Sequence, residues 1–168
     1  MARHNLQQAP RGMSRAAFLA AYAPVYEHSP WIAEAVFGTG LTEAQDTAEG
    51  LQAAMAEVVE AAPRDRQLAL LLAHPDLAGR LALTPQSASE QAGAGLGDCS
   101  PAEFQRFTAL NEAYKAKFGF PFIMAVKGRS RAEILAAFER RIGHDAAAEF
   151  RTALDEVHKI ALLRLRTL

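Results

Sequence analysis

The chain has 168 residues, of which 50% are hydrophobic and 22% are charged, and its formal net charge at pH 7 is -1. This length and composition are typical of one globular domain with a single hydrophobic core. Basic and acidic residues are mixed along the chain, so neither a broad cationic surface for nucleic acid nor a charged membrane tether is predicted. We therefore expect neither nucleic acid nor a membrane among its partners.

The single cysteine and the N-terminal stretch indicate the compartment. Cys99 has no second cysteine with which to form an internal disulfide or a zinc or redox pair. The stretch MARHNLQQAPRGMSR lacks the apolar segment of about 7 to 15 residues that a secretory signal needs, and no run of about 18 apolar residues occurs elsewhere. We expect a soluble protein of the cytoplasm.

Helix signals recur along most of the chain. Ser29 and Pro30 predict the N-cap and first turn of a helix that continues through WIAEAVF and ends at Gly38 and Gly40. Other helix starts are indicated by the S/T-x-x-E/Q capping box, in which two side chains bind free backbone N–H groups. These boxes are Thr42 with Gln45, Ser100 with Glu103, and Ser130 with Glu133.

Two helices in the second half of the chain show apolar residues at spacings of three and four. The first follows Ser100 and ends at Gly119, and the last begins at Asp145. The apolar face of the first helix consists of Phe104, Phe107, Leu110, Tyr114 and Phe118. The corresponding face of the last helix consists of Phe150, Leu154, Val157, Ala161, Arg164 and Leu168, so that it includes one charged residue.

The segment FPFIMAV, residues 120–126, resembles a strand but has no second alternating segment to pair with. Because a lone strand leaves backbone groups unpaired, we expect a buried extended segment or a short helix here. The chain as a whole is predicted to be all-α, a single compact helical domain of about seven or eight helices.

The segment AHPDLAGR, residues 73–80, directly follows an apolar helical run. One interpretation is a helix stop, in which His74 favours the helix C-terminus, Pro75 prevents continuation and Asp76 begins the turn. The other is that Pro75 holds the His74 imidazole rigidly at a cavity, as a general acid or base. We expect Asp76 to secure the turn by hydrogen bonding to backbone.

The segment SASEQ carries a carboxylate beside an amide. Ser87 is predicted to cap a short helix with Glu90 at the fourth position, and Glu90 and Gln91 are also suited to face a polar ligand. The glycines of AGAGLGD do not match G-x-G-x-x-G or a P-loop, so a dinucleotide site is rejected.

Two further features suggest ligand contacts. Pro121 interrupts regular structure in FGFPFIMAV, so nearby backbone groups need partners outside a helix, and a ligand with amide or urea edges is one such partner. Arg164 either extends past the helix end into solvent or is a buried guanidinium paired with a carboxylate of the protein or of a ligand.

A metal site is the alternative for the polar residues. His74, Asp76 and Glu90 with another histidine (His28, His144 or His158) form a possible nitrogen and oxygen ligand set, but no H-x-x-x-H or H-E-x-x-H pair occurs. A metal-dependent hydrolase of a ureide or cyclic amide therefore remains an alternative function, as does a helical binding or scaffold domain without chemistry.

Four segments in order, HPDLAGR, SASEQAGAGL, LNEAYKAKFGFPFIMAVKG and EVHKIALLRL, together resemble the OHCU decarboxylase family. OHCU is 2-oxo-4-hydroxy-4-carboxy-5-ureidoimidazoline, the last unstable intermediate between urate and allantoin. The resemblance implies an all-α homodimeric carboxy-lyase with a small-molecule substrate and neither cofactor nor metal, functionally coupled to urate oxidase and hydroxyisourate hydrolase. It divides the chain into a flexible N-terminal segment, 1–12, and an OHCU decarboxylase-like helical domain, 13–168.

The resemblance also implies roles for individual residues. His74 matches the catalytic histidine of the family, and Glu90 matches its second catalytic residue. The implied substrate-binding residues are Pro75, Ser87, Ala88, Ser89, Gln91, Phe122, Ile123, Met124, Ala125, Val126 and Arg164, of which residues 122–126 act through backbone groups. Where the family pattern predicts asparagine before the last helix, this chain has His144. The C-terminus LRTL lacks an S-K-L address, which favours a cytoplasmic form of bacterial type.

The chemistry of OHCU explains why the resemblance implies no cofactor. The carboxylate lies next to a C=N bond, which accepts the electron pair that loss of CO₂ releases. The protein then has to orient the carboxylate, exclude water and deliver a proton to one face, which gives (S)-allantoin. We expect His74 to handle the substrate hydroxyl or donate the proton, and Glu90 to orient the same centre.

Overall fold

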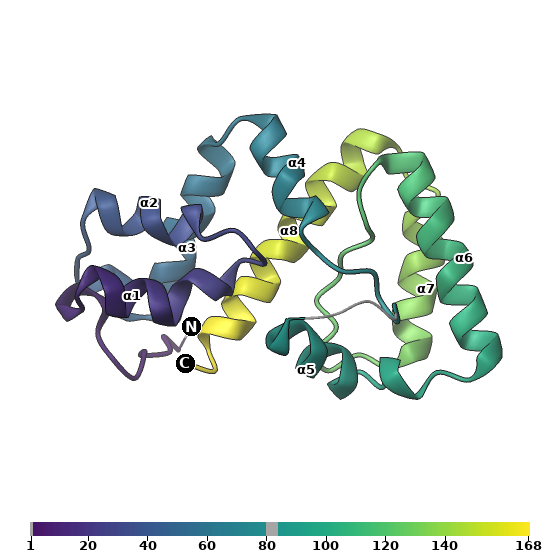
Figure 1. Ribbon diagram of the computed structural model, residues 1–168, viewed down its shortest axis with the longest axis horizontal. Helices are drawn as coiled ribbons and strands as arrows, with labels where there is room; N and C mark the ends of the chain where they lie inside the picture. The colour runs from purple at the N-terminus through teal and green to yellow at the C-terminus, as the bar shows by residue number, and fades with distance from the viewer. Residues whose placement is uncertain (1, 80–83) are drawn as a thin grey trace. The chain divides into compact units, whose positions relative to one another are not determined.

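The protein is represented by a computed structural model that describes residues 2–79 and 84–168. Within these residues it contains eight α-helices, four short 3-10 helices and no strand (Figure 1). The prediction of an all-α fold with seven or eight helices is therefore confirmed. None of the helices in the described part of the chain is both long and apolar enough to cross a membrane.

The chain forms two compact units, one from residues 1–73 and 158–168 and the other from residues 74–157. Unit 1 contains η1 (Pro10–Gly12), α1 (Arg15–Tyr22), η2 (Ala23–Val25), α2 (Trp31–Thr39), η3 (Glu43–Asp46), α3 (Ala48–Ala61) and α4 (Arg64–Leu72). Unit 2 contains α5 (Pro85–Gly93), η4 (Leu96–Asp98), α6 (Pro101–Phe118) and α7 (Arg131–Arg141). The last helix, α8 (Ala146–Leu165), contributes its first part to unit 2 and its remainder to unit 1.

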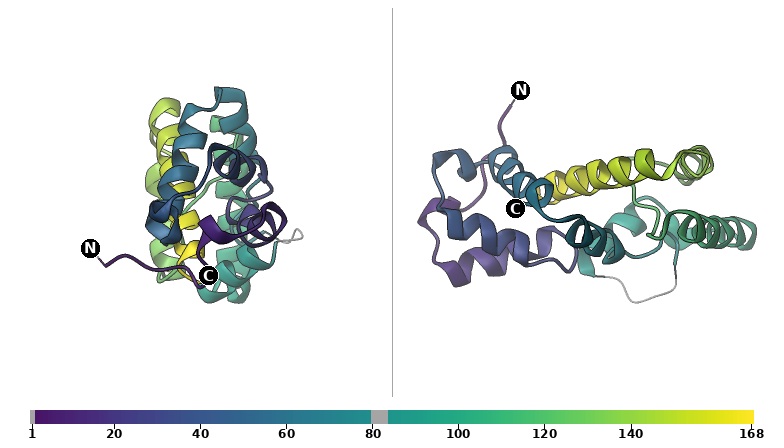
Figure 2. Two further views of the ribbon diagram at one scale, coloured as in Figure 1. Left: turned by 90° about the vertical axis from the view of Figure 1, so that its left-hand side faces the viewer. Right: turned by 90° about the horizontal axis from the view of Figure 1, so that it is seen from above.

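The core of unit 1 lies among α1, α2 and α3, where α2 packs against both α1 and α3 (Figures 1 and 2). Phe18, Ile32, Leu51 and Met55 are at most 1% exposed there. Burying side chains of this size stabilises a fold by about 1.5–3 kcal/mol each. These three helices therefore form a core from residues that are close in the sequence.

The N-terminal segment is bonded to other parts of unit 1, which the sequence did not predict. The N–H of Leu6 donates to the carbonyl of Asp46 at 3.1 Å, and the N–H of Ala48 donates to the carbonyl of His4 at 2.8 Å. Leu6 itself is 7% exposed. These bonds join the segment to the start of α3, and its expected flexibility stays a prediction.

The core of unit 2 is aromatic. The rings of Phe122 and Phe138 stack with centroids 3.9 Å apart, and Tyr114 meets both edge-on. Each such pair contributes about 0.5–1.5 kcal/mol beyond the area it buries. Residues 121–126 lie outside any helix or strand, with Phe122 fully buried, so of the two expectations, a buried extended segment or a short helix, the helix is wrong.

Most of the predicted helix ends are confirmed. Thr42 and Ser100 form complete capping boxes, the latter at the start of α6, and the hydroxyl of Ser130 accepts from the N–H of Glu133 at 3.2 Å. The carboxylate of Asp145 accepts from Ala148 at the start of α8. Gly119 ends α6 with a φ of +79°, a conformation that glycine adopts without strain.

Two predicted caps are wrong. The hydroxyl of Ser29 donates to the carbonyl of Glu27 at 2.9 Å, and α2 begins after Pro30 without a side-chain cap. Ser87 lies inside α5, where its N–H donates to the hydroxyl of Thr84 at 3.2 Å. Pro85 causes this shift, because proline favours the first helical position and places the cap on the residue before it.

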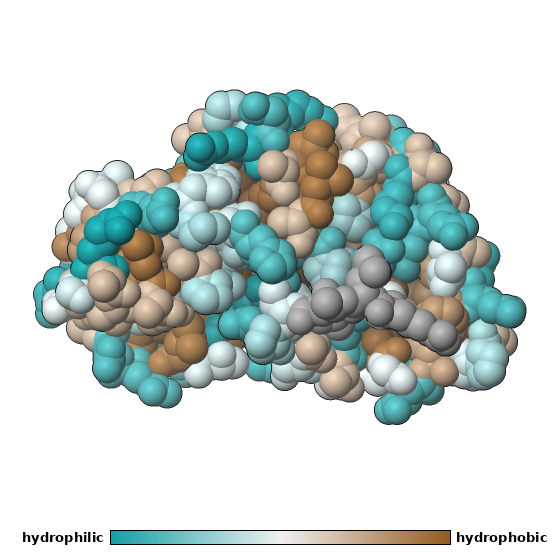
Figure 3. Space-filling model, in the orientation of Figure 1, coloured by the Kyte–Doolittle hydropathy of each residue, from teal (hydrophilic) through white to brown (hydrophobic). Residues whose placement is uncertain are grey.

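Polar residues are spread over the face of the molecule that Figure 3 shows, with smaller hydrophobic areas between them. Among the residues that the structure describes, the large hydrophobic side chains that are exposed are Leu72, at 55%, and Leu168, at 38%. Leu168 was predicted to continue the buried face of α8, but the helix ends at Leu165. The other large apolar side chains of residues 2–79 and 84–168 are buried or partly buried.

Candidate active site

His74 is placed by the end of α4. The helix ends at Leu72, and Pro75 follows His74 directly, where its ring prevents the helix from continuing. The interpretation of this segment as a helix stop is confirmed. The His74 side chain is also largely shielded from water, since the residue is 9% exposed. The helix stop and a largely buried histidine therefore occur together at the same residues.

The turn after Pro75 has an uncommon backbone. Ala78 has a φ of +56°, in the left-handed region that residues with a Cβ rarely adopt. The N–H of Gly79 donates to the carbonyl of Asp76 at 3.4 Å. A residue held in this region costs on the order of 1–2 kcal/mol, so contacts from elsewhere must maintain the turn.

Gln91 of α5 supplies two of these contacts. Its side-chain oxygen accepts from the N–H of Ala78 at 3.0 Å, and its side-chain nitrogen donates to the carbonyl of Asp76 at 3.3 Å. The residue is 7% exposed. The amide that was predicted to bind substrate thus binds the backbone of the turn, and its contact with substrate stays a prediction.

Two residues of α6 supply the other contacts. The amide nitrogen of Asn111 donates to the carbonyl of Leu77 at 2.9 Å. The ammonium of Lys115 pairs with the carboxylate of Asp76 at 2.7 Å, whereas this carboxylate was expected to bind backbone. We call the side chains of Gln91, Asn111 and Lys115 the turn clamp.

The predicted residues of α5 lie on two sides of the helix. Ser87 and Gln91 are four positions apart and both buried, and Glu90 is half-buried beside them. Ala88 and Ser89 are exposed, and the N–H of Ala88 is bonded to the carbonyl of Thr84 at 2.8 Å. The structure thus brings Ser87, Glu90 and Gln91 together on one side and directs Ala88 and Ser89 elsewhere.

The extended segment at residues 122–126 finds partners for several of its backbone groups within the protein. The carbonyl of Ile123 accepts from the guanidinium of Arg141 at 2.7 Å, and the N–H of Ala125 donates to the carboxylate of Glu156 at 2.8 Å. The carbonyl of Val126 accepts from the N–H of Arg129. The protein's own groups therefore hold the backbone of residues 122–126, which the resemblance assigns to substrate binding. The Met124 side chain in this segment is half-buried.

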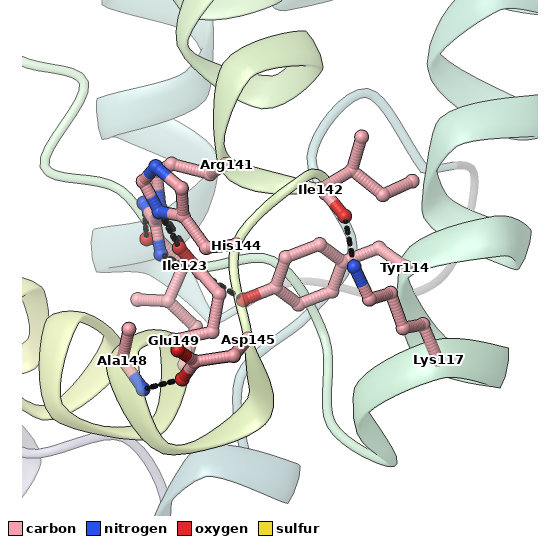
Figure 4. Close-up of polar contacts among 9 residues, drawn as sticks. All are labelled: Tyr114, Lys117, Ile123, Arg141, Ile142, His144, Asp145, Ala148 and Glu149. Atoms are coloured by element: carbon pink, nitrogen blue, oxygen red, sulfur yellow. Dashed lines mark hydrogen bonds and ion pairs between the residues drawn. The ribbon is translucent and has the colours of Figure 1, made fainter.

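A buried ion pair supports this segment (Figure 4). The Arg141 guanidinium binds the Glu149 carboxylate at 3.0 Å, and the two side chains are 6% and 0% exposed. The guanidinium also lies 4.3 Å from the centre of the Phe122 ring. Tyr114 donates to the same carboxylate at 2.5 Å, and His144 meets it at 3.0 Å.

The sequence analysis missed both members of this pair. Glu149 is four and eight residues before Ala153 and Val157, on the buried face of α8, so a charged residue at an apolar position was a usable signal. Burial first, and then the hydrogen bond and charge of Glu149, raise the pKa of Tyr114. Its phenol therefore remains a hydrogen-bond donor to the carboxylate at neutral pH.

Arg164 belongs to unit 1, whereas His74, Glu90 and residues 122–126 belong to unit 2. Its guanidinium pairs with the carboxylate of Glu27 at 2.8 Å and donates to the carbonyl of Val25 at 3.2 Å. The two charged side chains are 7% and 1% exposed. The interpretation of Arg164 as a buried guanidinium is confirmed, with a protein carboxylate, Glu27, as its partner.

The metal-site alternative gains no support from the residues that the structure describes. Among residues 2–79 and 84–168, no group of three or more His, Cys, Asp or Glu side chains is arranged to hold a metal ion. Arg80, the last residue of the HPDLAGR segment, lies outside the described residues.

Comparisons with known proteins agree with the motifs. A family model described as OHCU decarboxylase matches residues 11–166. The chain is 48% identical to 2-oxo-4-hydroxy-4-carboxy-5-ureidoimidazoline decarboxylase of Haloferax volcanii, over 95% of this chain and 93% of that protein. It is 36% identical to a uric acid degradation bifunctional protein of Bacillus sp. strain TB-90, over 92% of this chain and 30% of that protein.

A solved structure is also similar. The crystal structure of (S)-allantoin synthase aligns with a TM-score of 0.75 and 35% sequence identity, covering 94% of this chain. This chain spans 52% of the (S)-allantoin synthase chain.

Proposed function

This chain belongs to the OHCU decarboxylase family, and from that premise we propose that it converts OHCU to (S)-allantoin in the degradation of urate. The observation that carries the proposal is the 48% identity, over nearly the full length of both chains, to a decarboxylase of this substrate. The buried His74 in a fixed turn is the feature of the structure that such a reaction needs.

The substrate itself accepts the electrons in the proposed reaction. The C–C bond to the carboxylate breaks and CO₂ leaves; the released electron pair forms a C=C bond to the imine carbon, and the C=N π pair moves to nitrogen, which takes up a proton. A second proton then adds to one face of the former imine carbon, while the neighbouring hydroxyl loses its proton and becomes a carbonyl. What remains for the protein is to orient the carboxylate, exclude water and supply that proton.

His74 is the residue we assign to proton transfer. It is shielded from water, and Pro75 together with the turn clamp restricts its backbone. Glu90, half-buried on α5, is assigned to orient the reacting centre. Ser87, Gln91 and the backbone at residues 122–126 are the proposed contacts of the ring and ureido group.

The same family membership supports proposals for assembly, compartment and pathway. We propose a homodimer in the cytoplasm, working after urate oxidase and hydroxyisourate hydrolase. The bifunctional relative supports the pathway, because that protein is named for uric acid degradation. A region similar to this chain makes up part of its longer chain.

The proposed activity is tested by generating OHCU in situ from urate and following the circular dichroism of the allantoin formed. With the protein present, we expect faster decay of OHCU and an excess of the S enantiomer, whereas spontaneous decay gives both enantiomers. Decay that is neither faster nor more enantioselective would contradict the proposal. A parallel reaction with a chelator tests the metal-dependent hydrolase, since chelation should abolish that activity.

Testing whether Arg164 binds substrate requires two substitutions, because the residue also neutralises Glu27. Arg164→Met alone leaves the Glu27 carboxylate buried without its partner, which is expected to destabilise the protein by about 3–5 kcal/mol. The double variant Glu27→Met with Arg164→Met removes both charges and should fold nearly as stably as the wild type. We expect its KM for OHCU to rise at least about tenfold, as for a lost hydrogen bond from a charged group.

The measurement combines thermal unfolding of both variants with steady-state kinetics of the double variant. A double variant with wild-type stability and wild-type KM would show that Arg164 serves the fold and not the substrate.

A further inference from the structure

We infer that Asn111 and Lys115 of α6 are positioning residues for His74. The inference rests on the proposed decarboxylation, and it assigns a task to two polar residues of the LNEAYK part of α6 for which the sequence alone predicted no role. Neither side chain is assigned a contact with substrate. Both act on the turn that follows Pro75.

The two residues are one helical turn apart on the same side of α6. They bind consecutive residues of the turn: Lys115 pairs with the carboxylate of Asp76 at 2.7 Å, and Asn111 donates to the carbonyl of Leu77 at 2.9 Å. One rigid helix therefore holds two adjacent points of the chain. This arrangement fixes the direction of the turn as well as its place.

Pro75 passes this restraint on to His74. A proline ring fixes its own φ and also restricts the backbone of the residue before it. Few torsions are therefore available between Asp76 and His74 to absorb a movement of the turn. If the turn shifts, the Cα of His74 shifts with it, and so does the origin of the imidazole.

The backbone at Ala78 explains why the turn needs to be held. Its φ of +56° is unfavourable for alanine, so an unrestrained turn would relax to another conformation. The amide of Gln91 binds Ala78 and Asp76 from α5, and the pair on α6 binds Asp76 and Leu77. The turn is thus restrained from two helices.

The environment of Asn111 argues against a role in stability alone. The residue is 5% exposed, and its side-chain oxygen has no hydrogen-bond partner among the described residues. A buried acceptor without a partner costs free energy, which an apolar side chain of similar size would avoid. Unlike an apolar side chain, the Asn111 amide donates a hydrogen bond to the Leu77 carbonyl.

Lys115 offers the cleaner variant, because its side chain is 43% exposed and an ion pair at such a site adds little to stability. We expect Lys115→Gln to fold like the wild type and to lower kcat at least about fivefold with little change in KM, since a misplaced catalytic group slows the reaction more than it weakens binding. The S excess of the allantoin should fall as well. Lys115→Arg, which keeps the charge pair, should restore most of kcat.

The matched control is Lys117→Gln. Lys117 is on the same helix, and its ammonium donates to the carbonyl of Ile142 at 2.7 Å, away from the turn. This variant should keep the kcat and S excess of the wild type. Asn111→Leu is the second test variant, with the same expected loss of kcat. If Asn111→Leu does not fold, the inference is judged from Lys115→Gln and Lys117→Gln alone.

The assay measures kcat, KM and S excess on OHCU generated in situ, corrected for spontaneous decay, together with the unfolding temperature. Wild-type kcat and S excess in Lys115→Gln, or equal losses in Lys117→Gln, would overturn the inference while the decarboxylase activity stands. A wild-type protein that does not accelerate the decay of OHCU overturns the proposed function and this inference together.

Discussion

Replacement of His74 by alanine is expected to lower kcat/KM for OHCU by at least about 10²-fold, the low end of the range for acid-base residues. The protein should remain folded, because the turn clamp binds residues 76–78 and not the imidazole. Without a proton donor at a fixed position, water protonates the former imine carbon, and it can do so from either face. The residual product should therefore contain both enantiomers of allantoin.

Steady-state kinetics and circular dichroism of the product check this prediction, with His4→Ala as the control for loss of a histidine. His4 is exposed and bonds through its backbone, so its replacement should change neither rate nor enantiomer ratio. Turnover by His74→Ala at the rate of the wild type would remove His74 from the mechanism.

Glu90→Ala is the companion variant and should lose a similar factor of at least about 10²-fold if its carboxylate orients the reacting centre. The two variants should differ in the enantiomers of their residual product. Loss of an orienting group should still leave His74 to protonate one face, so the product of Glu90→Ala should retain some S excess. A racemic product from both variants would place Glu90 in the proton transfer itself.

Local patterns predicted most of the fold. The spacing of apolar residues identified the buried face of α6, and capping residues such as Ser100 and Asp145 gave the helix starts. The errors at Ser29 and Ser87 differ in kind: Pro85 occupies the first turn of α5 and leaves the cap to Thr84, whereas α2 begins one residue later than predicted, after Pro30. A capping pattern therefore locates a helix start to within a few residues, and it can be correct beside a proline, as Ser100 before Pro101 shows.

The candidate site could be predicted in part. His74 and Pro75 were identified because their chemistry is local and visible in the segment HPD. Asn111 and Arg141 were missed because their partners, the carbonyls of Leu77 and Ile123, are 34 and 18 residues away. Spacing along a helix predicts its neighbours within a few residues and says nothing of such distant backbone partners.

Substitution of Glu149 by glutamine is expected to lower the free energy of unfolding by about 3–5 kcal/mol. The Glu149 carboxylate is fully buried and neutralises Arg141, whose side chain is 6% exposed. Glutamine keeps the size of the side chain but not its charge, so the guanidinium would remain buried without its counter-charge. The cost arises from that unpaired charge and not from lost packing.

Chemical denaturation of Glu149→Gln against Glu139→Gln provides the measurement. Glu139 also pairs with an arginine, Arg106, at 2.9 Å, but the Glu139 side chain is 46% and the Arg106 side chain 51% exposed, so this control should lose less than about 1 kcal/mol. Replacing both Arg141 and Glu149 by apolar residues should recover much of the stability, while freeing the Ile123 carbonyl that Arg141 holds. If both variants lose the same free energy of unfolding, burial does not determine how much the Arg141–Glu149 ion pair contributes to stability.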